Sequence, residues 1–326
     1  MKLNRVPLAH LPTRIEHLPQ LTKTLGGPQI YCKRDDQTGL GFGGNKTRKL
    51  EYLLGDALQH NARTLVSMGA IQSNHCRQVA AVAARAGLDC ILVLSGTSPE
   101  FATGNLFLDR LFGAEVVWAD RENRQQVLEE TVERAEETGR APYMIPYGGS
   151  NAVGMMGYFD AIKELREEEE RLGLHFDWIV TASSSGGTQA GMVLGARVWQ
   201  FSGKILGIAI EGTSEELGET VATLVNESID MNGLDITIDD NTIIVNDHYT
   251  GEGYGVMGDP EIKAIRMFAS LEGLLLDPVY TGRAAAGLID LVRKGFFTKE
   301  EKVLFWHTGG TPALFAEPYL SKLQFS

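Results

Sequence analysis

Cysteine, basic charge and long apolar runs are all scarce in this sequence of 326 residues. Cys32, Cys76 and Cys90 are an odd number without a CxxC pair, which predicts reduced thiols in a reducing compartment rather than a disulfide framework. Lys and Arg number 30 against 42 Asp and Glu, for a formal charge of −12. That balance argues against binding to nucleic acid or to an anionic membrane surface.

Membrane and metal signals are missing as well. No apolar run approaches the roughly 20 residues that a spanning helix needs, and residues 1–17 lack the apolar core of a secretory signal. We therefore expect a cytoplasmic protein that does not contact a membrane. The seven histidines show no H-E-x-x-H or other ligand spacing, so we expect no metal site.

Short apolar runs alternate with amphipathic stretches, which predicts an α/β protein built from parallel units. The length favours two lobes over one core. We predict strands at 29–33, 64–68, 90–94, 115–118, 143–145, 178–182, 205–210 and 303–307. We predict helices at 46–59, 75–86, 105–112, 121–138, 152–171 and 188–201, and one that opens at Asp259-Pro260. No element is assigned to 214–246, and no role to Cys76 beyond packing.

Four loops that follow predicted strands are rich in Gly, Ser, Thr and Asn: 39–46, 69–75, 183–188 and 308–311. In open parallel sheets, ligands bind in loops at the carboxyl ends of strands. The first loop contains a G-x-G-x-x-G match, typical of dinucleotide binding. The next strand ends at Met68 without an acidic residue for a ribose hydroxyl, so a nicotinamide-dependent dehydrogenase is a disfavoured alternative.

Lys46 follows Asn45 at the first turn of a predicted helix, where the helix dipole is unfavourable for a cation. From the residues alone, two interpretations stay open. Lys46 joins Arg48 and Lys49 in a solvated basic turn, or it is a buried amine with a lowered pKa that can form a Schiff base.

The loop at 183–188 reads SSSGGT, and it places small residues and backbone N–H groups at a helix N-terminus. This pattern favours an anion site, and the lack of a Gly-Lys-Ser/Thr ending favours a single phosphate monoester over a nucleotide. The alternative is a flexible, serine-capped loop. In the loop at 69–75, Ser73 is a candidate for proton relay, or equally a helix cap, and His75 is more typical of a structural residue than of a base.

Taken together, these stretches resemble the D-cysteine desulfhydrase and 1-aminocyclopropane-1-carboxylate deaminase group of pyridoxal-phosphate enzymes. The resemblance runs from about residue 10 to about residue 315. The motifs, in the order of the group, are KRDD (33–36), GGNKTRKLE (43–51), GAIQSNH (69–75), PYGGSN (146–151), GYGV (253–256), LDPVYTG (276–282) and HTGG (307–310).

The resemblance implies the tryptophan-synthase-β-like fold, fold type II: two open twisted α/β lobes with pyridoxal 5'-phosphate between them. The larger lobe would comprise 1–50 and 159–326, and the smaller lobe 51–158. Such enzymes are usually homodimers.

The resemblance also implies roles for single residues. Lys46 holds the cofactor covalently, and Asn74 bonds its ring hydroxyl. Ser73, Tyr254 and Tyr280 are catalytic residues on the side of the substrate. The other expected cofactor-binding residues are Asn45, Ser185, Gly186, Gly187, Thr188 and Thr308.

Two positions separate the members of the group. The deaminases carry Glu where this chain has Thr281, and an apolar residue where it has Thr308. A carboxylate keeps the pyridine nitrogen protonated and makes the ring a strong electron sink, whereas a threonine hydroxyl does not. A weaker sink suffices when a β-substituent leaves readily.

We therefore expect β-elimination from a small amino acid, D-cysteine first, giving pyruvate, sulfide and ammonia. The alternatives within the group are an L-cysteate sulfo-lyase, which needs a further cation such as Arg48 or Arg77, and a 1-aminocyclopropane-1-carboxylate deaminase. A non-catalytic pyridoxal-phosphate-binding protein is the alternative outside it.

Overall fold

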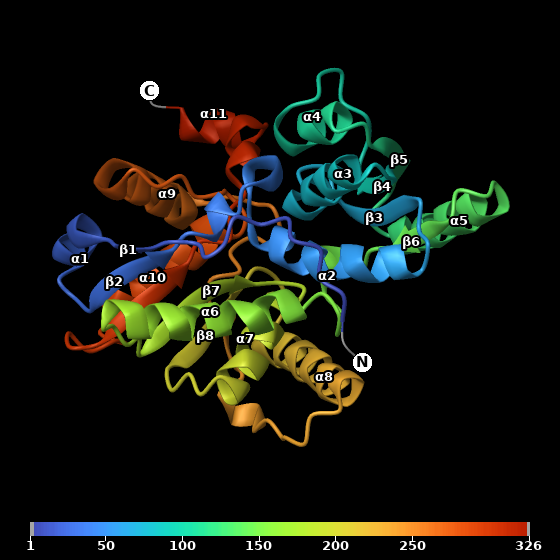
Figure 1. Cartoon of the computed structure of the whole chain (residues 1–326). Helices are drawn as coiled ribbons and strands as arrows, with labels where there is room; N and C mark the ends of the chain where they lie inside the picture. The colour runs from blue at the N-terminus through green and yellow to red at the C-terminus, as the bar shows by residue number, and fades with distance from the viewer. Residues whose placement is uncertain (1–2, 325–326) are drawn as a thin grey trace.

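The computed structural model describes residues 3–324 and contains two sheets (Figure 1). The six-stranded sheet has the order β1-β2-β10-β7-β8-β9, and only the β1–β2 pair is antiparallel. Its strands are β1 (Ile15–His17), β2 (Gln29–Lys33), β7 (Trp178–Ser183), β8 (Lys204–Ala209), β9 (Ile244–Asn246) and β10 (Lys302–Trp306). The four-stranded sheet, parallel throughout, has the order β5-β4-β3-β6. Its strands are β3 (Thr64–Ala70), β4 (Asp89–Ser95), β5 (Glu115–Ala119) and β6 (Pro142–Met144).

Both faces of the larger sheet are covered, which is why its strands β7, β8 and β10 are buried at nearly every position. Val303 and Phe305 of β10 face one layer of helices, and Leu304 and Trp306 face the other, as the period of two in a strand requires. The first layer comprises α1 (Pro19–Leu25), α9 (Asp259–Glu272) and α10 (Thr281–Arg293). The second comprises α6 (Met156–Leu172), α7 (Gly187–Val198) and α8 (Ser214–Asn232).

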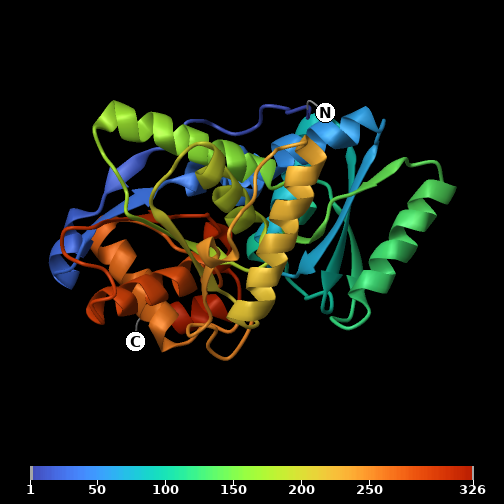
Figure 2. The same cartoon turned by 90° about the horizontal axis from the view of Figure 1, so that it is seen from below.

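The smaller sheet is sandwiched in the same way, and Figure 2 shows its helix α5 on the outer side. Leu65 and Leu92 face α2 (Asn45–Gln59), α3 (Asn74–Ala86) and α4 (Gly104–Leu111). Val66 and Val93 face α5 (Arg124–Glu137). The expected α/β fold of two open lobes is confirmed. The lobe boundaries at 50/51 and 158/159 stay a prediction.

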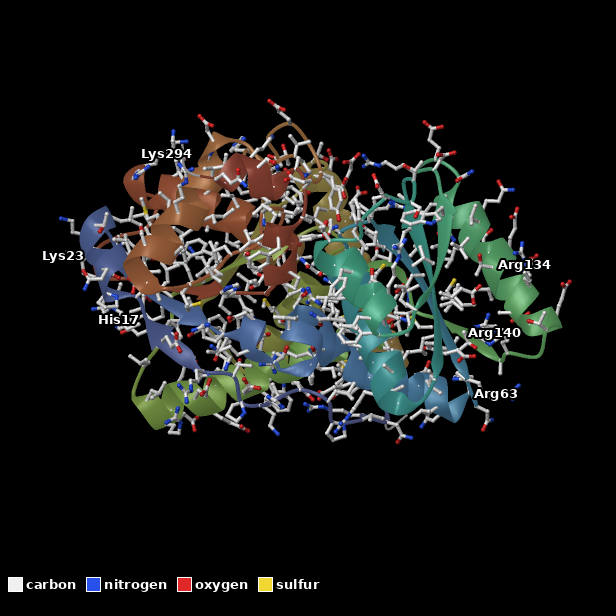
Figure 3. All side chains as sticks on the ribbon, turned by 90° about the horizontal axis from the view of Figure 1, so that it is seen from above. His17, Lys23, Arg63, Arg134, Arg140 and Lys294 are labelled. Carbon is white, nitrogen blue, oxygen red and sulfur yellow. The ribbon has the colours of Figure 1, made fainter. Side chains whose placement is uncertain are left out.

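The charged residues labelled in Figure 3 lie at the two outer ends of the molecule. His17, Lys23 and Lys294 stand at the far end of the larger lobe, and Arg63, Arg134 and Arg140 at the far end of the smaller one. The short elements that complete the chain are η1 (Asp35–Gln37), η2 (Leu40–Phe42), η3 (Tyr147–Gly149), η4 (Asp240–Thr242), η5 (Thr311–Phe315) and α11 (Tyr319–Leu323).

The predicted elements are present, with small shifts at their ends: the helix predicted from 121 begins at Arg124, and the strand predicted at 143–145 spans Pro142–Met144. The segment without a prediction contains the 19-residue helix α8. A capping box between Thr213 and Glu216 starts this helix, and Leu217, Val221 and Leu224 form its buried stripe. Within 3–324, no helix combines the length and the apolar character needed to cross a bilayer.

Candidate active site

A cavity lies between the lobes, at the carboxyl ends of strands from both sheets. Nine of the predicted site residues line it: Asn45, Lys46, Ser73, Asn74, Ser185, Gly186, Thr188, Tyr280 and Thr308. The other two predicted site residues, Gly187 and Tyr254, are not among the described residues that line the cavity. Gly187 is the first residue of α7, directly behind the loop that forms the wall. Tyr254 stands behind Tyr280, and their hydroxyl oxygens are 2.7 Å apart.

Lys46 is a buried-type amine rather than part of a solvated turn. Burial, with the nearby Arg77 guanidinium as a second cause, lowers the pKa of Lys46 to about 8, although Asp277 opposes the shift. The alternative of a solvated basic turn is wrong for its neighbours as well, since Arg48 is 2% exposed and Lys49 is fully buried. An amine that is partly neutral near physiological pH is suited to attack a carbonyl carbon.

Arg48 anchors the helix that carries Lys46. Its Nε lies 2.9 Å from Asp35 Oδ2, and its Nη1 lies 2.9 Å from Glu164 Oε2 on α6. Burial alone would raise the pKa of Asp35, but Arg48 overrides it and lowers that pKa to about 2. Trp306 donates to the same carboxylate over 2.8 Å, which ties the start of α2 to β10. A buried pair with this many partners fixes position more than it adds stability.

The loop from Ser183 into α7 is the predicted anion cradle, and its binding of an anion stays a prediction. Gly186 has φ +75°, a conformation that favours glycine, and the N–H of Gly187 donates to Ser150 Oγ over 3.3 Å. Ser150 Oγ is 2.8 Å from Ser185 Oγ. A Cβ at Gly187 would stand 2.6 Å from Ser150 Oγ, so the glycine leaves the space in front of the loop open.

Lys49 is a functional candidate that sequence reasoning missed. Its Nζ donates to Ser150 Oγ over 3.1 Å and to the carbonyl oxygen of Gly148 over 3.2 Å, behind the cradle. Burial, followed by the charge of Lys46, holds the pKa of Lys49 well below its ordinary value. The available signal was its spacing of three from Lys46, which places both on one face of α2.

Asn74, the first residue of α3, faces the cavity with a fixed amide. Its Oδ1 accepts hydrogen bonds from Asn105 Nδ2 over 2.9 Å and from Arg77 Nη1 over 3.2 Å. Because the oxygen is occupied, the NH₂ group is the part free to donate to a ligand. Asn45 acts through a neighbour, since its Nδ2 donates to Thr188 Oγ1 over 3.0 Å.

Of the two discriminating threonines, Thr308 lines the cavity but Thr281 does not. Thr281 is fully buried, and its hydroxyl donates to Asp277 Oδ1 over 2.7 Å while accepting from the Asp277 N–H over 2.7 Å. Of these two threonines, Thr308 is therefore the one whose hydroxyl can meet a ligand in the cavity. Asp277 draws Thr281 inward because its buried carboxylate also caps the backbone N–H groups at the start of α10.

Ser73 and His75 occupy the wall with different roles. Ser73 caps α3, since its Oγ accepts from the Cys76 N–H over 3.1 Å, and its own proton remains to be donated. His75 Nε2 is 2.9 Å from Ser67 Oγ, and burial together with Lys46 and Lys49 keeps its pKa well below its usual range. A neutral, buried imidazole fits the structural role expected of it. Within residues 3–324, no cluster of three or more His, Cys, Asp or Glu is arranged to hold a metal ion.

These groups fit a phosphorylated aromatic aldehyde. The cradle offers N–H groups and hydroxyls to a phosphate, Lys46 offers an amine of lowered pKa to a carbonyl, and Asn74 offers an NH₂ to a ring hydroxyl. Ser183 Oγ is buried and has no hydrogen-bond partner among the described residues, as expected of a group reserved for a ligand.

Comparison with known proteins agrees with this chemistry. The family model described as "Pyridoxal-phosphate dependent enzyme" matches residues 6–309. The 1-aminocyclopropane-1-carboxylate deaminase of Rhizobium leguminosarum bv. viciae is 38% identical, covering 98% of each chain. The deaminase of Burkholderia vietnamiensis is 42% identical over 96% of each chain.

Solved structures give the same result. The crystal structure of an "ACC deaminase homologue" superimposes with a TM-score of 0.90 at 39% identity, covering 99% of this chain and 96% of that one. A pyridoxal 5'-phosphate-dependent aspartate racemase shares the fold alone, with a TM-score of 0.66 at 19% identity over 96% of this chain and 93% of that one. The chain therefore belongs to the family of pyridoxal-phosphate-dependent enzymes of fold type II, and its cofactor is pyridoxal 5'-phosphate.

Proposed function

We propose that this enzyme is a lyase that eliminates the β-substituent of a small amino acid, D-cysteine first, to release pyruvate, sulfide and ammonia. The observation that carries the proposal is the charge of the cavity wall. Among the described residues of the wall there is no carboxylate, and Thr308 supplies a neutral hydroxyl. Bound pyridoxal phosphate supplies an electron sink for the α-carbon, and without a carboxylate partner at its nitrogen that sink is weak.

The residues of the wall divide into those that bind and those that move protons. Ser185, Gly186, Gly187 and Thr188, with Asn45 behind them, hold the phosphate. Lys46 would hold the cofactor and, as a free amine, would take the α-proton of the substrate. Its pKa of about 8 keeps a substantial neutral fraction at neutral pH.

On the side of the substrate, the Ser73 hydroxyl is free to donate to the substrate carboxylate or to pass on the α-proton. Tyr280 and, behind it, Tyr254 present a pair of hydroxyls that can bond the leaving group. Burial raises the pKa of both phenols well above the ordinary value, so they act as neutral donors. A leaving thiolate needs such a donor and no further cation.

A sulfonate leaving group needs a cation in addition to Lys46. Among the described residues that line the cavity there is no other lysine or arginine, which disfavours an L-cysteate sulfo-lyase. Arg48 is committed to Asp35 and Glu164. Arg77 is buried, and its guanidinium donates to Asn74, Asn105 and the carbonyl of Gly43. Neither arginine can reach a substrate without breaking these bonds.

A 1-aminocyclopropane-1-carboxylate deaminase is the second candidate, because relatives at about 40% identity carry that name. Ring opening has no leaving group and requires a stronger sink than a threonine hydroxyl supports. The family match removes the dehydrogenase alternative. Intact Lys46 and Ser73 argue against a binding protein without turnover.

The deciding experiment compares substrates of the purified, cofactor-loaded enzyme. D-cysteine, L-cysteine and L-cysteate are assayed for pyruvate, and 1-aminocyclopropane-1-carboxylate for 2-oxobutyrate, with Lys46→Ala as the inactive control. Sulfide and pyruvate from D-cysteine alone support the proposal. Rapid formation of 2-oxobutyrate overturns it and means that Thr308 does not decide the chemistry.

We also propose, from the family resemblance, that the enzyme is a homodimer, which light scattering at twice the chain mass would support. A cytoplasmic location is likewise a proposal. It agrees with three cysteines that are all buried and unpaired.

A further inference from the structure

Tyr147 lines the cavity from the smaller lobe and has no part in the function proposed above. It opens η3, three residues after the end of β6. The next residue, Gly148, is held in place. Its carbonyl accepts a hydrogen bond from Lys49 Nζ over 3.2 Å, and an added Cβ would overlap Ser185 Oγ. The backbone of Tyr147 is therefore fixed against the phosphate cradle.

The Tyr147 side chain joins the tyrosine pair of the larger lobe. Burial, followed by the neighbouring Tyr147 phenol, raises the pKa of Tyr254 well above its ordinary value, and the Tyr254 hydroxyl oxygen is 2.7 Å from that of Tyr280. The rings of Tyr254 and Tyr280 meet edge to face, with centroids 6.1 Å apart. Tyr147 and Tyr280, which line the cavity, and Tyr254, which stands behind Tyr280, thus form one group that spans both lobes, here called the tyrosine wall.

The part of this wall that belongs to the larger lobe is held rigidly. Arg283, which is 1% exposed, donates to the carbonyls of Gly253 and Val256 over 3.0 and 2.7 Å, on either side of Tyr254. The Tyr280 N–H donates to the buried Asp277 carboxylate over 3.1 Å. Neither backbone can retreat easily to admit a larger ligand.

The Tyr147 ring is confined from outside as well. The Arg124 guanidinium lies over it, 5.2 Å from the centroid, and the ring packs against the core that contains Val66 and Met68. Next to it, Arg121 on the smaller lobe lies 3.3 Å from Glu211 on the larger. A bulky substituent in the cavity would have to displace a ring that is packed on its other side.

We propose that Tyr147 is a specificity-determining residue, which closes the cavity at the tyrosine wall and restricts the substrate to a small, uncharged β-substituent. The ring sets the size limit, and the shared hydroxyls set the preference for a hydrogen-bonding, uncharged group. The size limit depends only on the shape of the cavity. The choice of substituent rests on the proposed β-elimination.

The test replaces Tyr147 in the cofactor-loaded enzyme and measures elimination from D-cysteine, S-methyl-D-cysteine and S-ethyl-D-cysteine. Each S-alkyl substrate yields pyruvate, ammonia and the corresponding thiol. We expect Tyr147→Ala to raise the kcat/KM ratio of S-ethyl-D-cysteine to D-cysteine by about tenfold or more, since single methylenes are discriminated on that scale. Tyr147→Phe keeps the ring and should leave that ratio within about threefold.

An unchanged ratio in Tyr147→Ala, with the visible cofactor band intact, overturns the proposal. If that variant loses the band, Tyr147→Leu takes its place, with the same expectation in a milder form.

A binding series separates this inference from the proposed function. Alanine, 2-aminobutyrate and norvaline, as both enantiomers, are titrated against the cofactor absorbance of the wild type and of Tyr147→Ala. The wild-type dissociation constant should rise with side-chain length, and the rise should be flattened in the variant. That result supports the role of Tyr147 even if D-cysteine gives no pyruvate. A lack of pyruvate from D-cysteine would contradict the proposed function but not the role of Tyr147. Parallel series in both proteins defeat the role of Tyr147.

Discussion

Asn105 Nδ2 donates to Asn74 Oδ1 over 2.9 Å, and the two asparagines come from neighbouring helices, α4 and α3. Asn105 is itself held by Gln72, whose Oε1 accepts from the Asn105 N–H over 2.8 Å and whose carbonyl accepts from Nδ2 over 2.8 Å. The Asn74 amide, which faces the cavity, is therefore oriented from behind by a fully buried side chain that does not line the cavity.

Asn105→Ala removes this orientation. We expect a shifted absorption maximum of the bound cofactor and an increase of about five- to tenfold in its dissociation constant, since one buried hydrogen bond contributes about 1 kcal/mol. Absorbance titration of the apoenzyme with pyridoxal phosphate gives both. Asn241→Ala, an exposed asparagine that bonds only Asp239, is the control. An unshifted spectrum and unchanged affinity in Asn105→Ala would contradict the role of Asn105.

Lys46 should load its cofactor at a lower pH than an ordinary lysine. With a pKa of about 8, about a quarter of the amine is neutral at pH 7.5, against about one in a thousand at the ordinary value. Because the neutral amine is the nucleophile, the rate of cofactor attachment to apoenzyme should rise with pH and level off above about 8.

Stopped-flow absorbance between pH 6 and 10 checks this, with Nα-acetyllysine as the reference, because free pyridoxal phosphate also titrates. A rate that parallels acetyllysine up to pH 10 would mean that burial and Arg77 do not depress the pKa of Lys46.

Gly148→Ala tests how tightly the smaller lobe fits the phosphate cradle. Gly148 has φ +64°, and an added Cβ would overlap Ser185 Oγ. Gly173 is the matched control, since its φ is +62° and no described atom lies within 4 Å of an added Cβ. Both variants carry the cost of a left-handed alanine, of order 1 kcal/mol, so the difference between them isolates the clash. We expect Gly148→Ala alone to weaken cofactor binding, by about tenfold or more in equilibrium dialysis.

Much of the fold was predictable because buried parallel strands and amphipathic helices leave strong patterns. Helix α8 was missed, although its buried stripe of Leu217, Val221, Leu224, Val225 and Ile229 is interrupted by Ser228 alone and a capping box precedes it. The match to G-x-G-x-x-G was misleading: the glycines bend the chain around η2, with φ +95° at Gly39, +57° at Gly41 and +64° at Gly43, and do not open a helix on a nucleotide.

The site was predictable where a residue lines the cavity. Lys46, Asn74 and Thr308 stand in motifs and line the cavity. Partners that act from behind were missed, because their geometry depends on contacts distant in sequence: Lys49 meets Ser150 across 101 positions. The burial of Thr281 outside the cavity could not be predicted either, because it depends on the hydrogen bonds that its N–H and hydroxyl make to the Asp277 carboxylate.

Asp109 on α4 is a buried carboxyl group whose two oxygens have no hydrogen-bond partner among the described residues. Burial raises its pKa to about 8, with Arg77 opposing the shift. For an acid whose pKa is raised by folding, the stabilisation is complete below the unfolded pKa, near 3.9, and is lost as pH rises through the folded value. The wild type should therefore lose stability between about pH 4 and pH 8.

Asp109→Asn removes this titration. The free energy of unfolding of the variant, relative to that of the wild type, should therefore increase by up to ~1.4 kcal/mol for each pH unit in that window. Urea unfolding of the apoenzyme at pH 5.5 and pH 8 measures the free energy of unfolding of both proteins. From the lower to the higher pH, we expect the difference between them to change in favour of the variant by at least about 2 kcal/mol. Comparing two pH values cancels any fixed cost of the new amide. The exposed Asp120→Asn should run parallel to the wild type. If Asp109→Asn also runs parallel, the Asp109 carboxyl is ionised in the folded protein, and Arg77 compensates its charge.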